Sequence, residues 1–189
     1  MNKYLTRQEL EKMCSEVNIS WFDFDDCLVD SLQADVTILN KRYGTNINKS
    51  EVICWNFRDV FPQLGEDKIE ELFDDSIFFE IVQLKPNAKE FILSIPNAKI
   101  ISKGRYKNLL LKNQWLHNNG LGGIPFIGIA LDDSKGDYIN YNSILIDDNK
   151  GNLDSVNCKY KVMFETNEFS EWQKKLARYE NKEVVNYGK

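Results

Sequence analysis

Cysteine is sparse in this chain, and long apolar runs are absent. The four cysteines, Cys14, Cys27, Cys54 and Cys158, stand far apart and form no CxxC pair. This pattern favours buried or free thiols in a reducing compartment over a disulfide framework. No apolar run is long enough to span a bilayer, and the polar residues 1–10 lack the apolar stretch of a signal peptide. These absences predict a cytoplasmic protein that does not enter a membrane.

Long runs of one charge are also absent. The 189 residues carry a net charge of −5 without a long Lys/Arg run, which disfavours nucleic-acid polymers and membrane surfaces as partners. The chain is 42% hydrophobic and 28% charged, as expected for a globular protein with one substantial core, or a core plus a small cap. The single histidine, His117, is predicted to lie on the surface near a helix end. A homodimer is compatible with the sequence.

Five short apolar runs, rich in β-branched residues or Phe, predict strands. They are residues 19–22, 98–101, 126–130, 144–146 and 159–164. Helical patterns lie between several of these runs. The alternation predicts an α/β fold in which a parallel sheet of about five strands is covered by helices on both faces.

Helical patterns also mark the two ends of the chain. Thr6 and Glu9 have the spacing of a capping box, and apolar residues at helical spacing follow, so we expect an opening helix. Four further apolar residues predict a last helix: Phe169, Trp172, Leu176 and Tyr179.

One segment interrupts the alternation, because residues 31–84 contain no strand pattern. We predict that residues 31–85 form a small helical cap inserted after the first strand, and that residues 1–30 and 86–189 form the core. The cap should cover the carboxyl edge of the sheet, where ligands of open α/β sheets bind. It contains an aromatic cluster: Trp55, Phe57, Phe61, Phe78 and Phe79. The cluster is either the core of the cap or a stacking pocket for a nucleobase.

The first predicted strand is followed by two carboxylates, Asp23 and Asp25. Since side chains alternate faces along a strand, we expect the strand to end here and a loop to aim both groups at one point. Two carboxylates that close together repel unless a cation or proton lies between them. The pattern therefore predicts a Mg²⁺ site with acid/base chemistry. An EF-hand loop is disfavoured because Leu28 stands at the sixth position, where Gly is needed.

Further polar residues follow the other predicted strands. Ser102 comes directly after the second run, and Lys135 lies in a loop after the third. Asp147 and Asp148 come directly after the fourth run. Because the carboxyl ends of parallel strands meet at one edge of the sheet, we expect these side chains to converge on Asp23 and Asp25.

A rival acidic pair is Asp132–Asp133, which also follows an apolar run. If this pair bound the metal, the lysine would have to lie upstream, as Lys112 does. Lys112 falls within a predicted helix, away from the strand ends, so we favour Asp147–Asp148 together with Lys135. The pair Asp132–Asp133 is then interpreted as a solvated loop.

The order of these residues resembles the haloacid dehalogenase superfamily of phosphohydrolases. Residues 23–31, DFDDCLVDS, are similar to its first motif, and Ser102, Lys135 and Asp147–Asp148 stand at the second, third and fourth motifs. The sequence IDDN at residues 146–149, with Asn152, is most similar to the 5′(3′)-deoxyribonucleotidases.

The chain departs from the family at three places. Asp26 stands where the family often has Gly, and Cys27 where it often has Thr or Val. Residues 101–105 lack the Thr-x-Ser/Arg-Pro pattern that is usual in the deoxyribonucleotidases. The first two departures concern the shape of the loop, and the third concerns the substrate.

The resemblance implies a Rossmann-like core and a phosphatase that works through an aspartyl-phosphate. Asp23 would attack phosphorus, and Asp25 would protonate the leaving oxygen and then activate water. Mg²⁺ would be held by Asp23, the main-chain carbonyl of Asp25, and Asp147. Ser102 would bind a phosphoryl oxygen and Lys135 would balance charge, whereas Asp148 would orient Lys135 or a water from outside the ligand set. The implied substrate-binding residues are Ser102, Lys103, Trp55, Phe78 and Phe79.

The favoured function is therefore Mg²⁺-dependent hydrolysis of a small phosphomonoester, in particular a (deoxy)nucleoside monophosphate. A phosphatase of sugar phosphates or other metabolites would use the same catalytic residues. A phospho-acceptor regulatory module also places carboxylates, Ser/Thr and Lys at strand ends, but in a different order. A non-catalytic binding protein is disfavoured because all four motifs are complete.

Overall fold

A computed structural model of the chain describes residues 5–53, 56–65, 72, 74–164 and 176–178. Within these residues, six strands form one sheet in the order β3-β2-β1-β4-β5-β6. The strands are β1 (Ile19–Asp23), β2 (Ala98–Lys103), β3 (Phe126–Ile129), β4 (Ser143–Asp147), β5 (Tyr160–Phe164) and β6 (Leu176–Arg178). Strands β1 to β5 pair in parallel, which confirms the parallel α/β sheet of about five strands predicted from the sequence.

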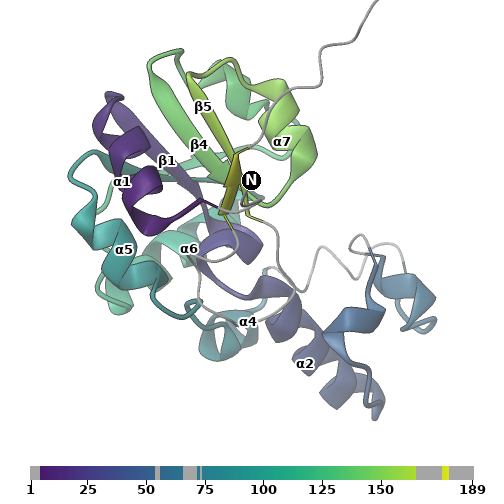
Figure 1. Cartoon of the computed structure of the whole chain (residues 1–189). Coiled ribbons are helices and arrows are strands. Elements are labelled where there is room, and N and C mark those ends of the chain that lie inside the picture. The colour runs from purple at the N-terminus through teal and green to yellow at the C-terminus, as the bar shows by residue number, and fades with distance from the viewer. Residues whose placement is uncertain (1–4, 54–55, 66–71, 73, 165–175, 179–189) are drawn as a thin grey trace, which may run out of the picture.

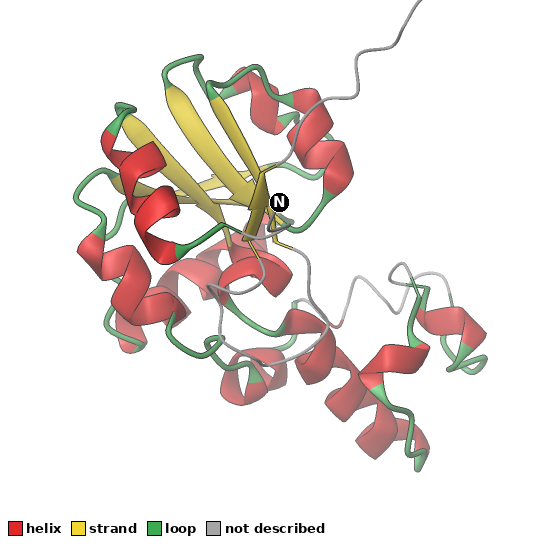
Figure 2. Cartoon of the chain, viewed as in Figure 1, coloured by secondary structure: helices red, strands yellow, loops and turns green. Residues whose placement is uncertain are grey.

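Helices flank this sheet (Figures 1 and 2). They are α1 (Arg7–Ser15), α2 (Ser31–Tyr43), α4 (Ser76–Ile81), α5 (Ala88–Ser94), α6 (Tyr106–Asn118) and α7 (Lys150–Ser155). The predicted capping box of α1 is confirmed, because the side chains of Thr6 and Glu9 each accept a hydrogen bond from the other residue's main-chain N–H. The opening helix therefore begins where the sequence pattern places it.

Both faces of the sheet are buried, because successive side chains along a strand point to opposite faces and each face carries an apolar cluster. Phe22, Ile100 and Ile146 point into a large core that also contains residues of α1, α2 and α5. Trp21 and Leu145, their neighbours along the strands, point into a second apolar cluster on the other face, together with residues of α7. With both faces covered, the edge of the sheet at the strand ends is the place where polar side chains can gather.

The prediction of a last helix is wrong at residues 176–178, which form strand β6. This strand pairs antiparallel with β5, with Met163 opposite Ala177. Without β6, the edge of β5 would present unpaired N–H and C=O groups. Pairing with these groups favours a strand at residues 176–178 more than the local helical spacing of apolar residues favours a helix. Phe169, Trp172 and Tyr179, the other residues of that pattern, lie outside the described part of the chain.

The described residues of the segment 31–85 form helices and loops but no named strand. A single β-bridge joins Leu84, near the end of the segment, to Val29, just before its start. The regular elements of the segment are α2, η2 (Lys49–Glu51), η3 (Phe57–Asp59) and α4. Figure 1 shows α2 beyond the end of β1. Two main-chain hydrogen bonds, Lys85 N to Leu28 O (2.9 Å) and Asp30 N to Gln83 O (3.1 Å), join the chain entering the segment to the chain leaving it. The division into core and cap stays a prediction.

Two findings bear on the expected environment of the protein. Among the described residues, no helix has both the length and the apolar character that a membrane span needs. Cys14, Cys27 and Cys158 are buried free thiols. Cys54 lies outside the described residues.

A buried carboxyl group in α2 leads to a stability prediction. Asp35 is fully buried, and neither of its oxygens has a hydrogen-bond partner among the described residues. Burial, followed by the charges of Asp25 and Asp26, raises the pKa of Asp35 well above its ordinary value. Because the folded state binds this proton more tightly, the stability that it supplies at low pH is lost as the pH rises above about 4. Asp35→Asn should therefore stabilise the protein by about 1–3 kcal/mol at about pH 8 and by less at about pH 5.

Urea unfolding of Asp35→Asn and the unmodified protein at both pH values measures this difference. The exposed Asp59 supplies a matched control, since Asp59→Asn should change stability little at either pH. An Asp35→Asn protein that is less stable than the unmodified protein at about pH 8 would contradict the prediction.

Candidate active site

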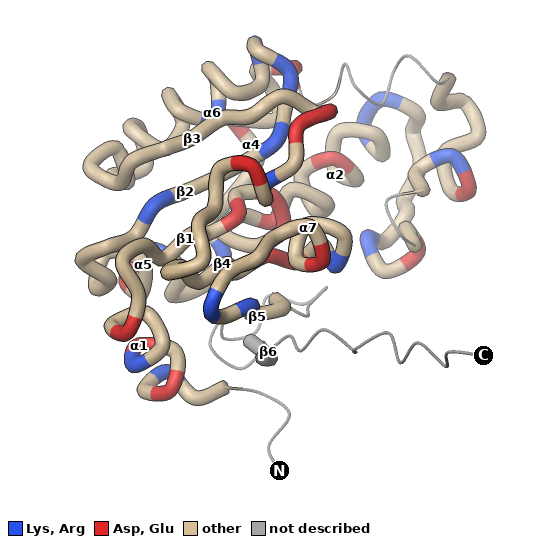
Figure 3. Tube along the Cα trace, turned by 90° about the horizontal axis from the view of Figure 1, so that it is seen from above, with Lys and Arg blue, Asp and Glu red and all other residues tan. Residues whose placement is uncertain are grey.

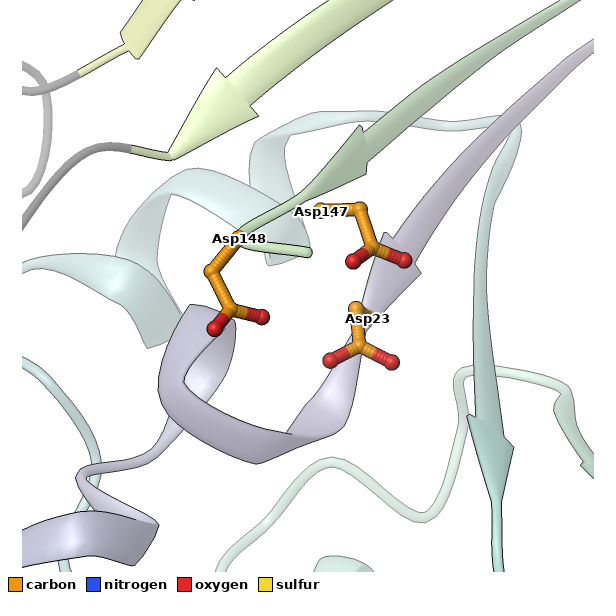
Figure 4. A group of neighbouring side chains, drawn as sticks. All are labelled: Asp23, Asp147 and Asp148. Atoms are coloured by element: carbon orange, nitrogen blue, oxygen red, sulfur yellow. The ribbon is translucent and has the colours of Figure 1, made fainter. Parts of the chain in front are cut away.

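The carboxyl ends of β1 and β4 bring three acidic side chains together (Figure 4). Asp23 is the last residue of β1, Asp147 is the last residue of β4, and Asp148 follows it. One carboxylate oxygen of each residue lies within 4.8 Å of those of the other two. The parallel pairing of β1 with β4 explains this proximity, because two neighbouring parallel strands end at the same edge.

Beyond Asp23 the chain leaves the strand in a tight turn, η1 (Phe24–Leu28). Asp25 keeps an extended backbone (φ −70°, ψ 132°), and Asp26 is left-handed (φ 50°, ψ −2°). Gly adopts a positive φ without steric cost, and Asp is one of the few other residues that tolerate it. This geometry explains why the family often has Gly where this chain has Asp26. The turn also places Asp25 in the same pocket as Asp23.

Lys135 lies between the carboxylates of the two strands. It belongs to the short helix η4 (Lys135–Asp137), and its side chain is 1% exposed. Its Nζ donates to Asp23 Oδ1 and, at 2.6 Å, to Asp147 Oδ2. Burial alone would lower the pKa of Lys135, but the charges of Asp23 and Asp147 outweigh burial and raise it. Lys135 is therefore a permanent cation between the two acids.

The acidic groups carry a net electrostatic cost even with Lys135 present. Burial raises the pKa of Asp23 to about 7, although Lys135 acts in the opposite direction. Burial, followed by the charges of Asp23 and Asp147, raises the pKa of Asp148 well above its ordinary value. One lysine does not compensate two buried carboxylates and the half-buried Asp148 beside them, so the site favours additional positive charge.

A divalent cation fits this requirement. The available donors are carboxylate oxygens, which hard ions such as Mg²⁺ prefer. Asp147 is held in place for such a role, because its carboxylate accepts hydrogen bonds from Asn149 N (2.8 Å) and Asn152 Nδ2 (3.1 Å to Oδ1). The structure thus groups Asp148 with Asp23 and Asp147, whereas the sequence interpretation placed Asp148 outside the ligand set.

A second lysine, Lys112, holds Asp25. Its Nζ donates to Asp25 Oδ2, to Ser102 Oγ (2.8 Å) and to the carbonyl of Lys103 (3.2 Å), and its side chain is 2% exposed. Ser102 Oγ lies 3.3 Å from the same Asp25 oxygen. The sequence interpretation placed Lys112 away from the strand ends, and that was wrong. Its Cα is in α6, but its long side chain returns to the edge of the sheet.

Two features of the sequence could have indicated that the side chain of Lys112 belongs to this site. The helix α6 follows β2 after a short connection, and Lys112 lies two turns into it, next to the buried Trp115 and Leu116 on the same helix. A lysine on the buried side of a helix requires an acidic partner. The helical stripe alone, however, does not say which acid that partner is.

A pocket of about 280 Å³ opens over these groups. Its lining consists of Asp23, Asp25, Lys103, Lys135, Asp148, Asn149 and Asn152. The structure therefore brings both carboxylates of the first motif into one pocket with Lys135 and Asp148. Ser102 and Asp147 are fully buried and do not belong to its lining.

Two of the aromatic residues predicted to bind substrate, Phe78 and Phe79, do not belong to the lining of this pocket. Phe78 is fully buried in the large core and packs edge-to-face on Phe79, with ring centroids 4.9 Å apart. This packing favours the interpretation of the cluster as a core over a stacking surface for a base. Trp55, the third predicted residue, lies outside the described residues.

The rival acidic pair lies elsewhere. Asp132 is exposed, and Asp133 accepts a hydrogen bond of 2.8 Å from the Tyr138 hydroxyl. Neither belongs to the group formed by Asp23, Asp147 and Asp148. The tube view in Figure 3 shows acidic segments near the ends of β1 and β4, with basic segments of neighbouring elements around them.

A parallel sheet that carries carboxylates after two adjacent strands, with a helical segment inserted after the first of them, defines the fold of the haloacid dehalogenase phosphohydrolases. Solved structures agree with this fold. A hydrolase from Streptococcus pneumoniae TIGR4 matches with a TM-score of 0.52 and 11% identity, over 74% of this chain and 87% of that one. A protein described as a predicted phosphoglycolate phosphatase from Haemophilus somnus 129PT matches with a TM-score of 0.54 and 16% identity, over 76% of this chain and 83% of that one.

The family is shown by the sequence itself. Residues 17–184 match the family described as 5′ nucleotidase, deoxy (pyrimidine), cytosolic type C protein, so the chain belongs to this family of the haloacid dehalogenase superfamily. It is a hydrolase of phosphomonoesters. No match was found among curated protein sequences.

Proposed function

We propose that this protein is a Mg²⁺-dependent phosphatase of (deoxy)nucleoside monophosphates that works through an aspartyl-phosphate on Asp23. The observation that carries the proposal is the meeting of Asp23, Asp147 and Asp148 beside Lys135. The family to which the chain belongs, named for deoxynucleotides and a cytosolic type, supports the nucleotide substrate and the cytoplasmic location.

In this proposal Asp23 acts as the nucleophile. It lines the pocket, and Lys135 favours its ionised form, which the attack on phosphorus requires. Its carboxylate oxygen forms a bond to phosphorus as the ester P–O bond breaks. Lys135 then balances the charge that accumulates on the phosphoryl oxygens.

In this proposal Asp25 supplies and removes the proton. It lines the same pocket, and Lys112 and Ser102 hold its Oδ2. In the first step its proton passes to the leaving oxygen of the ester. In the second step it takes a proton from the water that attacks the aspartyl-phosphate, which releases inorganic phosphate and restores Asp23.

The metal-binding residues in this proposal are Asp23, Asp147, Asp148 and the main-chain carbonyl of Asp25. When bound there, Mg²⁺ would neutralise negative charge on the phosphate and on the surrounding carboxylates. Lys103 contributes an amine to the pocket. Among the described residues that amine has a weak contact of 3.4 Å with the carbonyl of Leu131 and no carboxylate partner, so it is available to an anionic substrate.

A panel of phosphomonoesters tests the function. We expect phosphate release from 5′- or 3′-(deoxy)nucleoside monophosphates in the presence of Mg²⁺, complete loss of release in excess EDTA, and recovery when Mg²⁺ is added back. The panel measures inorganic phosphate at equal substrate concentrations. Absence of release from every nucleotide, with Mg²⁺ present, would reject the substrate class.

The buried position of Phe78 favours a second candidate, a phosphatase of sugar phosphates or other small metabolites, which needs no stacking surface. Sugar phosphates in the same panel separate the two candidates, because the better class of substrate should have the higher kcat/KM. A stable phosphoprotein without turnover would instead indicate a phospho-acceptor module.

A further inference from the structure

Asp25 is held at both oxygens, and the two sets of contacts come from different parts of the chain. Lys112 and Ser102 hold Oδ2 from the side of β2 and α6. On the other side, Ser31 Oγ donates to Oδ1 at 2.9 Å. Ser31 is the first residue of α2 and is fully buried, so its hydroxyl group is committed to this contact.

The first turn of α2 is tied to the same loop by a second hydrogen bond. Leu32 N donates to Asp26 Oδ1 at 3.1 Å. Asp30 caps the helix by accepting from Gln33 N at 3.1 Å, and it also pairs with Lys49 at 2.6 Å. Ser31 therefore lies on a capped helical turn, which the hydrogen bond from Leu32 to Asp26 joins to the loop carrying Asp25.

From these contacts we propose that Ser31 is a positioning residue, which fixes the rotation of the Asp25 carboxyl group about its Cβ–Cγ bond. The proposal rests on the proposed function, in which Asp25 transfers the proton. No role for Ser31 follows from the four motifs, in which it appears only as the last residue of the first one.

The physical reason is that one anchored oxygen does not orient a carboxyl group. The terminal torsion of Asp is broad, so contacts to Oδ2 alone allow Oδ1 to swing about that anchor. Ser31 supplies the second anchor. A hydroxyl group can either donate or accept a hydrogen bond, so Ser31 can keep the contact whether Asp25 acts as the acid or as the base.

The test compares two leaving groups. An alkyl phosphate, such as the best nucleotide of the panel, needs a proton on its leaving oxygen, whereas p-nitrophenyl phosphate has a leaving group that departs without one. In Ser31→Ala we expect kcat/KM for the alkyl ester to fall about 10- to 100-fold, and kcat/KM for p-nitrophenyl phosphate to fall less than about threefold. Because kcat/KM reports the first chemical step, hydrolysis of the aspartyl-phosphate does not mask the difference.

Two controls isolate the hydroxyl group of Ser31. Ser31→Thr keeps it and should restore most of the loss. Ser20→Ala removes another fully buried hydroxyl, bonded to Asn97 Oδ1 at 3.1 Å near the start of β1, and should leave the ratio of the two kcat/KM values unchanged. Since both substrates are measured on one preparation, a loss of folded protein cancels in that ratio.

The outcomes separate the two proposals. If the unmodified protein hydrolyses no phosphomonoester, the proposed function fails. If the unmodified protein is active and Ser31→Ala lowers both kcat/KM values equally, or neither, the inference about Ser31 is overturned and the proposed function stands. An unequal loss that Ser31→Thr restores supports it.

Discussion

Asp23→Asn is expected to abolish phosphate release while leaving the protein folded. Asn has nearly the same shape as Asp but cannot attack phosphorus, so turnover should fall by about four orders of magnitude or more. The loss of one buried negative charge should cost little stability, because burial already disfavours the ionised Asp23. Phosphate release and thermal unfolding measure the two effects on the same preparation.

The control for this variant is Asp132→Asn, which changes an exposed carboxylate in the loop after β3. It should retain full activity, and it also tests the rival acidic pair. Turnover by Asp23→Asn at the rate of the unmodified protein would remove Asp23 from the role of nucleophile. If Asp132→Asn were inactive, Asp132–Asp133 would again be a candidate for the metal-binding pair.

Lys135→Met is expected to combine a large loss of stability with loss of activity. Lys135 is buried between Asp23 and Asp147, so removing its charge leaves two buried carboxylates facing each other. Breaking a buried ion pair from one side costs about 3–5 kcal/mol. Urea unfolding in EDTA measures this cost, and added Mg²⁺ should recover part of it, since the ion replaces the missing positive charge.

The matched control is Lys107→Met, because Lys107 is an exposed lysine of α6. It should unfold at nearly the same urea concentration as the unmodified protein. If Lys135→Met were as stable as Lys107→Met in EDTA, the buried ion pairs of Lys135 would not contribute to the fold. If Mg²⁺ stabilised neither Lys135→Met nor the unmodified protein, the proposed metal site would be wrong.

The sequence was sufficient to predict the five parallel strands of the sheet and the polar residues near their carboxyl ends. The apolar runs before Asp23, Ser102 and Asp147 are short and local, and each was recognisable without knowing the rest of the chain. The edge of a parallel sheet then required these residues to converge, which the pairing of β1 with β2 and β4 bears out.

Other parts of the site depended on contacts that local patterns do not encode. Lys112 reaches Asp25 from a helix, and Ser31 reaches it from the first turn of another. A helical pattern shows which side of a helix is buried, but not which side chain of another element it meets. Lysine adds to this difficulty, because its long stem can place its charge far from its own Cα.

Sequence alone determined the parallel α/β core, the order of the motifs and the position of Asp23 at the end of the first strand, since these follow from short-range periodicity and the identity of residues at strand ends. Only the tertiary structure decided that residues 176–178 extend the sheet as β6, that Phe78 is buried in the core, and that Asp148 joins Asp23 and Asp147. The reason is that each of these outcomes depends on contacts between segments far apart in the chain. Whether an edge strand pairs, a ring is buried or carboxylates meet is decided by the free energy of those contacts. No single segment of the sequence contains both partners of such a contact.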